Sequence, residues 1–243
     1  VWGGEVLRAT ADGFDRVAHL APVLLPGGDA AITNPYRVAL AHLHAAGIDW
    51  ADDLVPVGSL DEDGESARGV LHRQLEGGFS CVPTTSMGRL FDGVAALVGL
   101  RQRISFEAQA AIELEIAATR SGWVERDHRF ELAVVDGVVI ADAAPVVRAV
   151  VEDLRAGVAV DDIAAAFHVA VVELVAAVVE RCRRDDERVV LSGGVFQNAA
   201  LTTWCVERLA ELGVPALTHH RVPPNDGGLA LGQAFVAAHT QEV

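Results

Sequence analysis

Two adjacent glycines, Gly193 and Gly194, separate an apolar run from a helical pattern in the segment LSGGVFQNAALTTWCVERL, residues 191 to 209. A glycine pair between a strand and a helix lets the backbone approach a phosphate closely, and the helix N-terminus offers free N–H groups and a partial positive charge. Ser192 and Asn198 could add hydrogen bonds. The competing interpretation is a plain tight turn, because the segment has neither the GxGxxG pattern of a Rossmann fold nor the GKS/T pattern of a P-loop.

A second glycine pair follows an acidic residue in RVPPNDGGLALGQA, residues 221 to 234. Two interpretations of Asp226 stay open. Asp is a favoured helix N-cap, and Pro223-Pro224 would simply end a strand. Alternatively, Asp226 is an oxygen ligand of a metal ion, placed at the same end of the sheet as the first glycine pair.

Hydroxyl, glycine and charged residues gather in VPTTSMGRLFDGVAALVGL, residues 82 to 100. Ser86 and Gly88 precede Arg89 and Asp92, and these last two are three residues apart, so a helix would place them on one face. One interpretation is a ribose or phosphate clamp that faces the first glycine pair. The other is a surface ion pair beside a capped helix, which contributes less than about 1 kcal/mol.

The histidines do not suggest a metal site. His42 and His44 are two residues apart on a predicted helix, which turns their side chains about 200° away from each other. His219 and His220 are adjacent at the end of a predicted strand and would point to opposite faces. We therefore expect all four to be solvated or core histidines.

Composition narrows the function classes. The chain has 243 residues, of which 51% are apolar and 5% aromatic, and its formal charge of −15 opposes binding to a polyanion such as DNA or RNA. The three cysteines are far apart, which favours reduced thiols in a cytoplasm. We expect no segment to span a bilayer, because Glu173 interrupts the longest apolar run, and the N-terminal residues lack the signal-peptide pattern.

Hydrophobic periodicity and turn residues predict an α/β domain. Strands are expected at 4–8 and 14–25 around Asp12-Gly13, at 188–191 and 214–218, and in a hairpin in ELAVVDGVVIA, residues 131–141, around Asp136-Gly137. Helices are expected at about 35–46, 67–76, 86–99, 105–120, 161–183, 198–212 and 227–239. The acidic segment 49–66 is expected to be a surface loop or short helical pieces.

Taken in order, these constellations resemble the hydrogenase maturation carbamoyltransferases, the HypF family. The resemblance rests on TTSMGRLFDGVAALVGL, ISFEAQAAIELE, LSGGVFQNAAL and RVPPNDGGLALGQA, and on the opening VWGGEVLRA and LAPVLLPGGDAAITNPYRVALAHL. More distantly, the SGG turn, Asn198 and Asp226 resemble the tRNA threonylcarbamoyl-adenosine synthase proteins and the antibiotic O-carbamoyltransferases. The resemblance implies their actin-like (ASKHA), two-lobed ATP-binding fold.

The resemblance also implies a chemistry. In the family, carbamoyl phosphate and ATP yield carbamoyl-adenylate, and this domain passes the carbamoyl group to the C-terminal cysteine of a HypE-type partner. The thiocarbamate is later dehydrated to the nitrile that becomes cyanide on the iron of NiFe-hydrogenase.

Site residues follow from the resemblance by position. The nucleotide would be held from the C-terminal lobe by Ser192, Gly193, Gly194 and Asn198, and from the opposite side by Ser86, Gly88, Arg89 and Asp92. Asp226 would be a ligand of a divalent metal, Fe, Zn or Mg, beneath the phosphates. The family's other ligands, a histidine-rich motif and an aspartate in an FDGTGYG-like loop, are absent from this sequence and would lie upstream of Val1.

We therefore expect an incomplete N-terminal lobe with strand remnants at 1–28, a mainly α-helical insert at 29–125, and a C-terminal α/β nucleotide-binding lobe at 126–243. Such a fragment would bind nucleotide weakly and turn over little. Two alternatives stay open: a non-catalytic partner-binding remnant, and an O-carbamoyltransferase or ATPase of the same fold. The expected location is the cytoplasm, with neither nucleic acid nor membrane as a partner.

Overall fold

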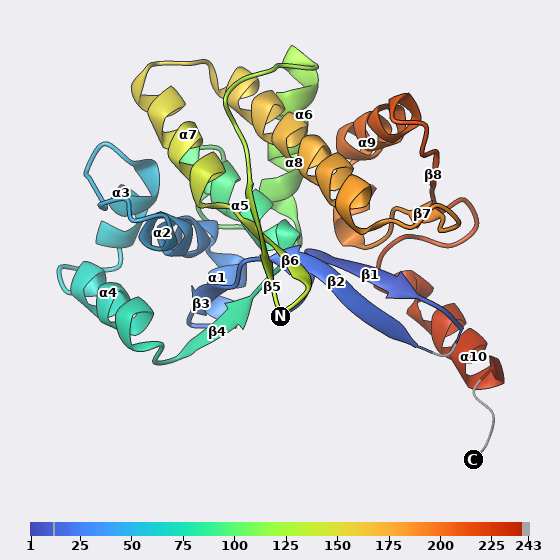
Figure 1. Cartoon of the computed structure of the whole chain (residues 1–243). Helices are drawn as coiled ribbons and strands as arrows, with labels where there is room; N and C mark the ends of the chain where they lie inside the picture. Colours follow the sequence, from blue (N-terminus) through green and yellow to red (C-terminus); the bar gives the residue numbers. More distant parts are fainter. Residues whose placement is uncertain (12, 240–243) are drawn as a thin grey trace.

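A four-stranded mixed sheet joins the N-terminal strands to a hairpin much later in the chain (Figure 1). The computed structural model describes residues 1–11 and 13–239. In sheet order the strands are β1 (Glu5–Ala9), β2 (Phe14–Leu20), β6 (Val138–Asp142) and β5 (Glu131–Val135). The β2–β6 contact is parallel and the two outer contacts are antiparallel. Segments from both halves of the chain therefore share one sheet.

The hairpin predicted from Asp136-Gly137 is confirmed. These two residues join β5 to β6 with φ angles of 51° and 82°. Positive φ at both positions is the requirement of a two-residue type I′ turn, which matches the twist of the strands. Asp12, in the other predicted turn at Asp12-Gly13, lies outside the described residues.

Two small sheets complete the β-structure. The strand predicted at 14–25 is two strands, because Pro22 has no N–H group and the chain changes partner after β2. The second strand, β3 (Val23–Pro26), pairs antiparallel with β4 (Cys81–Thr84). Near the C-terminus, β7 (Val189–Val190) pairs parallel with β8 (Ala216–Leu217).

Helices make up about half of the described residues. They are α1 (Asp29–Thr33), α2 (Pro35–Ala45), α3 (Val55–Asp61), α4 (Ala67–Gly77), α5 (Met87–Leu97), α6 (Gln109–Ser121), α7 (Ala144–Arg155), α8 (Val160–Cys182), α9 (Ala199–Glu211) and α10 (Leu229–His239), with short 3-10 turns η1 (Gly194–Gln197) and η2 (Asp226–Gly228). Each predicted helix is present, and α3 is a short helical piece of the acidic segment. The unpredicted α7 has Pro145 in its first turn and a buried valine face, and both features are typical of an amphipathic helix.

Helix α8 is the central core helix. Its residues Phe167 and Ile163 are fully buried, and the Phe167 ring meets that of Phe91 on α5 at a centroid distance of 4.9 Å. The expectation that no segment is long and apolar enough to span a bilayer is wrong for α8, which passes that test by length and composition. However, 78% of its apolar window is buried inside the fold, as in the core helix of a globular domain.

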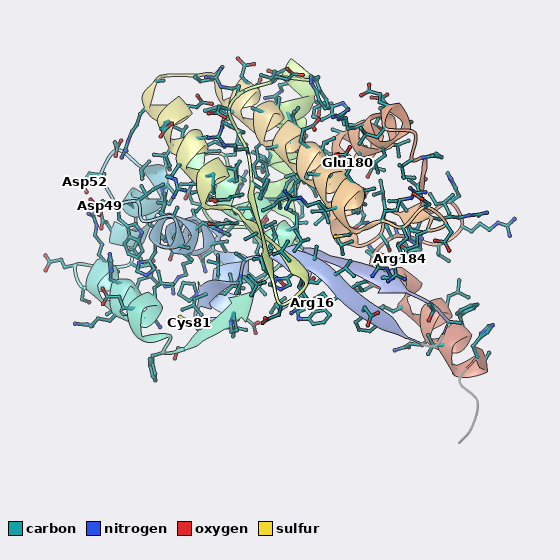
Figure 2. All side chains as sticks on the ribbon, in the orientation of Figure 1. Arg16, Asp49, Asp52, Cys81, Glu180 and Arg184 are labelled. Carbon is teal, nitrogen blue, oxygen red and sulfur yellow. The ribbon has the colours of Figure 1, made fainter. Side chains whose placement is uncertain are left out.

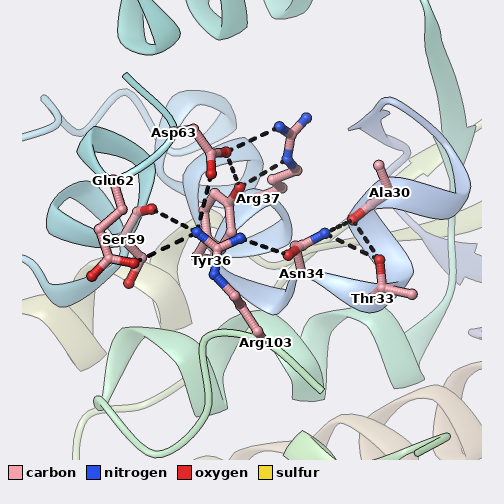
Figure 3. A network of polar contacts seen from close by, with 9 residues as sticks. All are labelled: Ala30, Thr33, Asn34, Tyr36, Arg37, Ser59, Glu62, Asp63 and Arg103. Carbon is pink, nitrogen blue, oxygen red and sulfur yellow. Dashed lines mark hydrogen bonds and ion pairs between the residues drawn. The ribbon is translucent and has the colours of Figure 1, made fainter. Parts of the chain in front are cut away.

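A polar network around Tyr36 fixes the helices next to this core (Figure 3). The buried Tyr36 hydroxyl on α2 donates to Asp63, just after α3. Arg103 binds Asp63 at 3.0 Å and Asn34 at 3.0 Å, and its guanidinium lies 5.0 Å from the centre of the Tyr36 ring. Arg37 also binds Asp63, at 3.3 Å. Burial, followed by the bond to Asp63, raises the pKa of Tyr36. The carboxylate and guanidinium groups satisfy one another, so this network joins helices rather than offering an open site.

The three cysteines are free thiols. Cys205 is buried, and burial raises its pKa to about 12. Cys81, on β4 in Figure 2, and Cys182 are half-buried, and desolvation raises the pKa of each. A thiol needs a lowered pKa to react as a thiolate at neutral pH, so these cysteines have the character of structural residues.

Helix α10 projects away from the helical body in Figure 1, and none of its residues is buried. Its apolar side chains Leu229, Leu231, Phe235 and Val236 are each at least 50% exposed. The predicted division at 28 and 125 stays a prediction. Strand β2 pairs with β6 of the predicted C-terminal lobe, whereas β3 pairs with β4 of the predicted insert.

Candidate functional site

The first glycine pair lies at the carboxyl end of the parallel β7–β8 pair. In α/β sheets this is the edge at which ligands bind. Gly193 has φ 99°, a conformation that side chains with a Cβ rarely adopt. The sequence therefore needs a glycine at this position for the turn itself, whether or not a ligand is present.

Free backbone donors remain at this turn. The Gly193 N–H donates to the Pro224 carbonyl at 2.8 Å. Within the described residues, the N–H groups of Gly194 and Val195 have no acceptor, because they open η1. Gly194 is exposed, and Val195 is partly buried, with its side chain packed against the core. Two adjacent free N–H groups are the recognised means of binding a phosphate oxygen.

The next helix, α9, does not offer the free N-terminus that the sequence suggested. The N–H groups of Ala199 and Ala200 donate to Glu115 Oε1 on α6, at 2.7 and 3.4 Å. The N–H of Leu201 donates to Asn198 Oδ1 at 2.8 Å. The expectation of free donors on this helix is therefore wrong, and η1 alone supplies them.

Asn198 is also engaged at its other end. Its Nδ2 lies 2.9 Å from Nε2 of His168, a fully buried residue of α8. Burial lowers the pKa of His168 to about 4, so its ring is neutral at pH 7. The ring Nδ1 lies 2.7 Å from the Ala164 carbonyl, so Nδ1 carries the proton and Nε2 accepts from Asn198. Asn198 thus positions the turn, and its predicted nucleotide contact stays a prediction.

The N-terminus of α5 lies against η1, next to the first glycine pair, as one interpretation of the segment at residues 82 to 100 predicts. A Cβ added to Gly88 would lie 3.7 Å from Val195 Cγ2. Ser86 is the N-cap of α5, and its Oγ accepts the Arg89 N–H at 3.4 Å. Ser86 and Gly88 are therefore brought next to the turn that carries the free N–H groups.

Arg89 and Asp92 form an ion pair at 2.9 Å on one face of α5. The Asp92 side chain is only 2% exposed, so the interpretation as a surface ion pair is wrong. Burial raises the pKa of Asp92 to about 6, although the Arg89 charge acts in the opposite direction. A buried carboxylate cannot reach a ligand at the turn directly, so it would act there through Arg89.

The N-terminal residues pack over this same end of α5. A Cβ on Gly4 would lie 2.4 Å from the Thr85 carbonyl, and one on Gly3 would lie 3.0 Å from Ser86 Oγ. The Thr85 N–H donates to the Val1 carbonyl at 2.9 Å. Only glycine fits this approach, which explains the glycine pair in VWGGEVLRA.

Asp226 is exposed at the start of η2, and its carbonyl accepts the Leu229 N–H, but within the described residues its carboxylate makes no hydrogen bond or ion pair. The interpretation as a helix N-cap is wrong, because Asn225 is the N-cap and accepts the Gly227 N–H at 3.0 Å. A Cβ on Gly227 or Gly228 would lie 2.8 or 2.9 Å from Pro223 atoms, so packing requires the second glycine pair.

A metal centre is not complete in this chain. No group of three His, Cys, Asp or Glu side chains in the described part of the chain could hold a metal ion. One exposed carboxylate does not bind a divalent cation tightly, because Ca²⁺ and Mg²⁺ take several oxygen ligands and Zn²⁺ takes three or four protein ligands. The residues present therefore do not by themselves fit the predicted metal.

Two surface hollows in the described part of the chain lie away from the glycine turn. One is lined by residues around the Arg126–Asp153 ion pair, and the other by residues around the Asp53–Arg155 ion pair. Both are rimmed by paired charges. The candidate site is thus an open face at the ends of β7, β8 and α5.

Comparison with known proteins shows the family to which the chain belongs. The family model described as "Carbamoyltransferase, Kae1-like Domain, second subdomain" matches residues 1–233. The carbamoyltransferase HypF of Rhodobacter capsulatus is 42% identical, and the match covers 98% of this chain and 30% of that protein. The HypF of Synechocystis is 33% identical, with 100% of this chain and 32% of that protein covered.

Two solved structures that resemble the chain come from the same family. A crystal structure of full-length HypF in a phosphate- and nucleotide-bound form matches with a TM-score of 0.83 and 33% identity, covering 97% of this chain and 30% of that one. The structure of T. kodakarensis HypF matches with a TM-score of 0.78 and 27% identity, covering 97% and 31%. The family model and the fold thus define a Kae1-like carbamoyltransferase domain.

The chain belongs to the HypF carbamoyltransferase family, within which it corresponds to the second subdomain of the Kae1-like domain. It has the mixed α/β fold of the HypF structures. The chain spans about a third of the length of the R. capsulatus and Synechocystis relatives.

Proposed function

We propose that this chain carries one side of an ATP-dependent carbamoyl-transfer site used in hydrogenase maturation. The observation that supports it most is the pair of free N–H groups on Gly194 and Val195, in a turn that packs against the N-terminus of α5. A phosphate placed there would be bound by backbone donors that need no rearrangement. The relatives are named carbamoyltransferases, and one HypF structure was solved with phosphate and nucleotide bound.

The proposed reaction transfers a carbamoyl group from carbamoyl-adenylate, made from carbamoyl phosphate and ATP, to the C-terminal cysteine of a HypE-like partner. The thiol sulfur forms a bond to the carbamoyl carbon, and the bond from that carbon to the adenylate oxygen breaks. AMP leaves with the electron pair, and the thiol proton passes to solvent. Negative charge develops on the leaving phosphate, so donors at η1 would stabilise the transition state more than the ground state.

Each predicted site residue has a part in this proposal. The free backbone N–H of Gly194 donates to the nucleotide, Gly193 supplies the positive φ of the turn, a hydroxyl comes from Ser192, and Asn198 holds the turn. On the opposite side, Ser86 and Gly88 border the phosphate, and Arg89, held by Asp92, supplies the positive charge. Asp226 is the one carboxylate that this chain would contribute to a divalent metal, Fe, Zn or Mg.

We further propose that the site is completed by a second lobe, as in actin-like ATP-binding proteins. The matching family model describes a second subdomain. The bare apolar surface of α10 supports this, because an isolated helix of 11 residues is marginal in water without a packed face. Alone, this chain would bind nucleotide weakly and transfer little. The proposed location is the cytoplasm, and neither nucleic acid nor membrane is a proposed partner.

A transfer assay tests the proposal. The chain is mixed with carbamoyl-adenylate and a peptide that ends in cysteine, with and without the first subdomain of a HypF relative, and the thiocarbamate is detected by mass spectrometry. We expect transfer only when both parts are present.

The incomplete set of metal ligands also favours the alternative of a partner-binding remnant. That alternative predicts binding of the partner peptide, no transfer in either mixture, and no binding of ATP. Product in the mixture that contains both parts would exclude it.

A further inference from the structure

Two backbone hydrogen bonds hold the loop after β8 against the glycine turn. The Leu191 N–H donates to the Leu217 carbonyl at 2.9 Å, and the Gly193 N–H donates to the Pro224 carbonyl at 2.8 Å. Ser192 lies between Leu191 and Gly193, the donors of these two bonds. Residues 218–223 form the loop between Leu217 and Pro224, the acceptors. A side chain of that loop can therefore meet Ser192 in a defined position.

His219 is that side chain. Its Nε2 lies 2.9 Å from Ser192 Oγ. The adjacent His220 turns away, and its Nε2 lies 3.4 Å from the hydroxyl of Thr218 within the same loop. The two histidines are adjacent in the sequence, with His219 half-buried and His220 exposed, and His219 is the one that contacts the turn that carries the free N–H groups.

We propose that His219 is a positioning residue for the phosphate site, acting through Ser192. When Nε2 carries the proton and donates to Ser192 Oγ, the single serine proton is free to turn toward a bound phosphate. The hydroxyl then joins the N–H groups of Gly194 and Val195 as a third donor at one anion. This inference rests on the proposed nucleotide role of the turn and adds to it the residue that orients Ser192.

Local charge agrees with an anionic ligand. The chain has a formal charge of −15, yet the segment next to the turn reads His219, His220, Arg221 and contains no acidic residue. If local charge alone mattered, both histidines would contribute equally to the affinity for a phosphate ligand. If the hydrogen bond to Ser192 matters, His219 contributes to that affinity and His220 does not.

The test is an NMR titration of the full chain with ATP, which measures a weak Kd. His219→Ala is expected to weaken binding about tenfold, as for the loss of one hydrogen bond to a charged group. His220→Ala is the matched control and should stay within about twofold of wild type. His219→Gln places an amide N–H near the position of Nε2 and should recover most of the affinity. Thermal denaturation should show the same Tm for all three variants, since both histidines lie at the surface.

A double-mutant cycle separates action through Ser192 from direct contact with the ligand. Ser192→Ala should match the loss in His219→Ala, and the double variant should lose no more than either. Wild-type affinity in His219→Ala, equal losses in both histidine variants, or additive losses in the cycle would each overturn the inference. If Gly194→Val abolishes binding while His219→Ala does not, the inference fails and the proposed function stands. If the wild-type chain does not bind ATP, both fail.

Discussion

The Glu115 carboxylate on α6 accepts the N–H of Ala199, the first residue of α9, at 2.7 Å. Glu115 thus occupies, from another helix, the position that an anionic ligand would take at a free helix N-terminus. This contact restricts a bound phosphate to the N–H groups of η1. It also ties α6 to α9 at the point where the glycine turn ends.

Removal of that carboxylate tests its structural role. Glu115→Ala should lower the free energy of unfolding by about 1 kcal/mol, as for the loss of a helix cap. It should not weaken ATP binding, because it removes a negative charge near the turn. Urea denaturation measures the first effect, with Glu107→Ala on the loop before α6 as the control. A loss of ATP affinity in Glu115→Ala at unchanged stability would contradict this account of the α9 terminus.

Asp92 should make the protein more stable in mild acid than at neutral pH. Its folded pKa is raised from 3.8 to about 6, so the folded state binds the extra proton between these values. Stability from this group therefore rises as pH falls through 6 toward 3.8, by up to about 3 kcal/mol. Relative to Asp92→Asn, the wild type should gain stability between pH 7 and pH 4. If the difference in unfolding free energy between the wild type and Asp92→Asn does not depend on pH, burial does not raise the pKa of Asp92.

His168 should give the opposite dependence. Its folded pKa is lowered from 6.5 to about 4, so the unfolded state binds the extra proton between these values. The stability present above pH 6.5 is lost as pH falls toward 4, again by about 3 kcal/mol. Urea denaturation of the wild type and His168→Gln, measured at several pH values, isolates this effect. A ¹⁵N NMR spectrum at pH 5 should show a neutral ring protonated at Nδ1. An imidazolium signal at that pH would contradict the assigned hydrogen bonds.

The sequence predicts the features that depend on local chemistry. The hairpin follows from Asp136-Gly137, because positive φ at both turn residues is a property of those residue types. The parallel strand ends near Gly193 follow from the strand–turn–helix order. Helix α7 shows the limit of this approach, since its first turn at Pro145 was recognisable but was not used.

Contacts between helices could not be predicted in the same way. Glu115 lies 84 residues before Ala199, and His168 lies 30 residues before Asn198. Each pair is in contact only because α6, α8 and α9 pack together. The hydrophobic periodicity of a sequence segment predicts a helix but not which helices pack against each other. The buried position of Asp92 is likewise a property of packing around α5. The need for glycine at Gly227 and Gly228 comes from their close contact with Pro223, which is also a property of packing.

The central claim is that the turn at Gly193 and Gly194 binds the phosphate of a nucleotide, and Gly194→Val tests it most directly. Gly194 does not have positive φ, and a Cβ there would meet only Gln197 Oε1 at 4.0 Å, so the fold should tolerate the change. The added side chain would cover the two free N–H groups. In an NMR titration with ATP, we predict a Kd at least about tenfold weaker than wild type, at unchanged Tm. An unchanged Kd in the folded variant would contradict the claim.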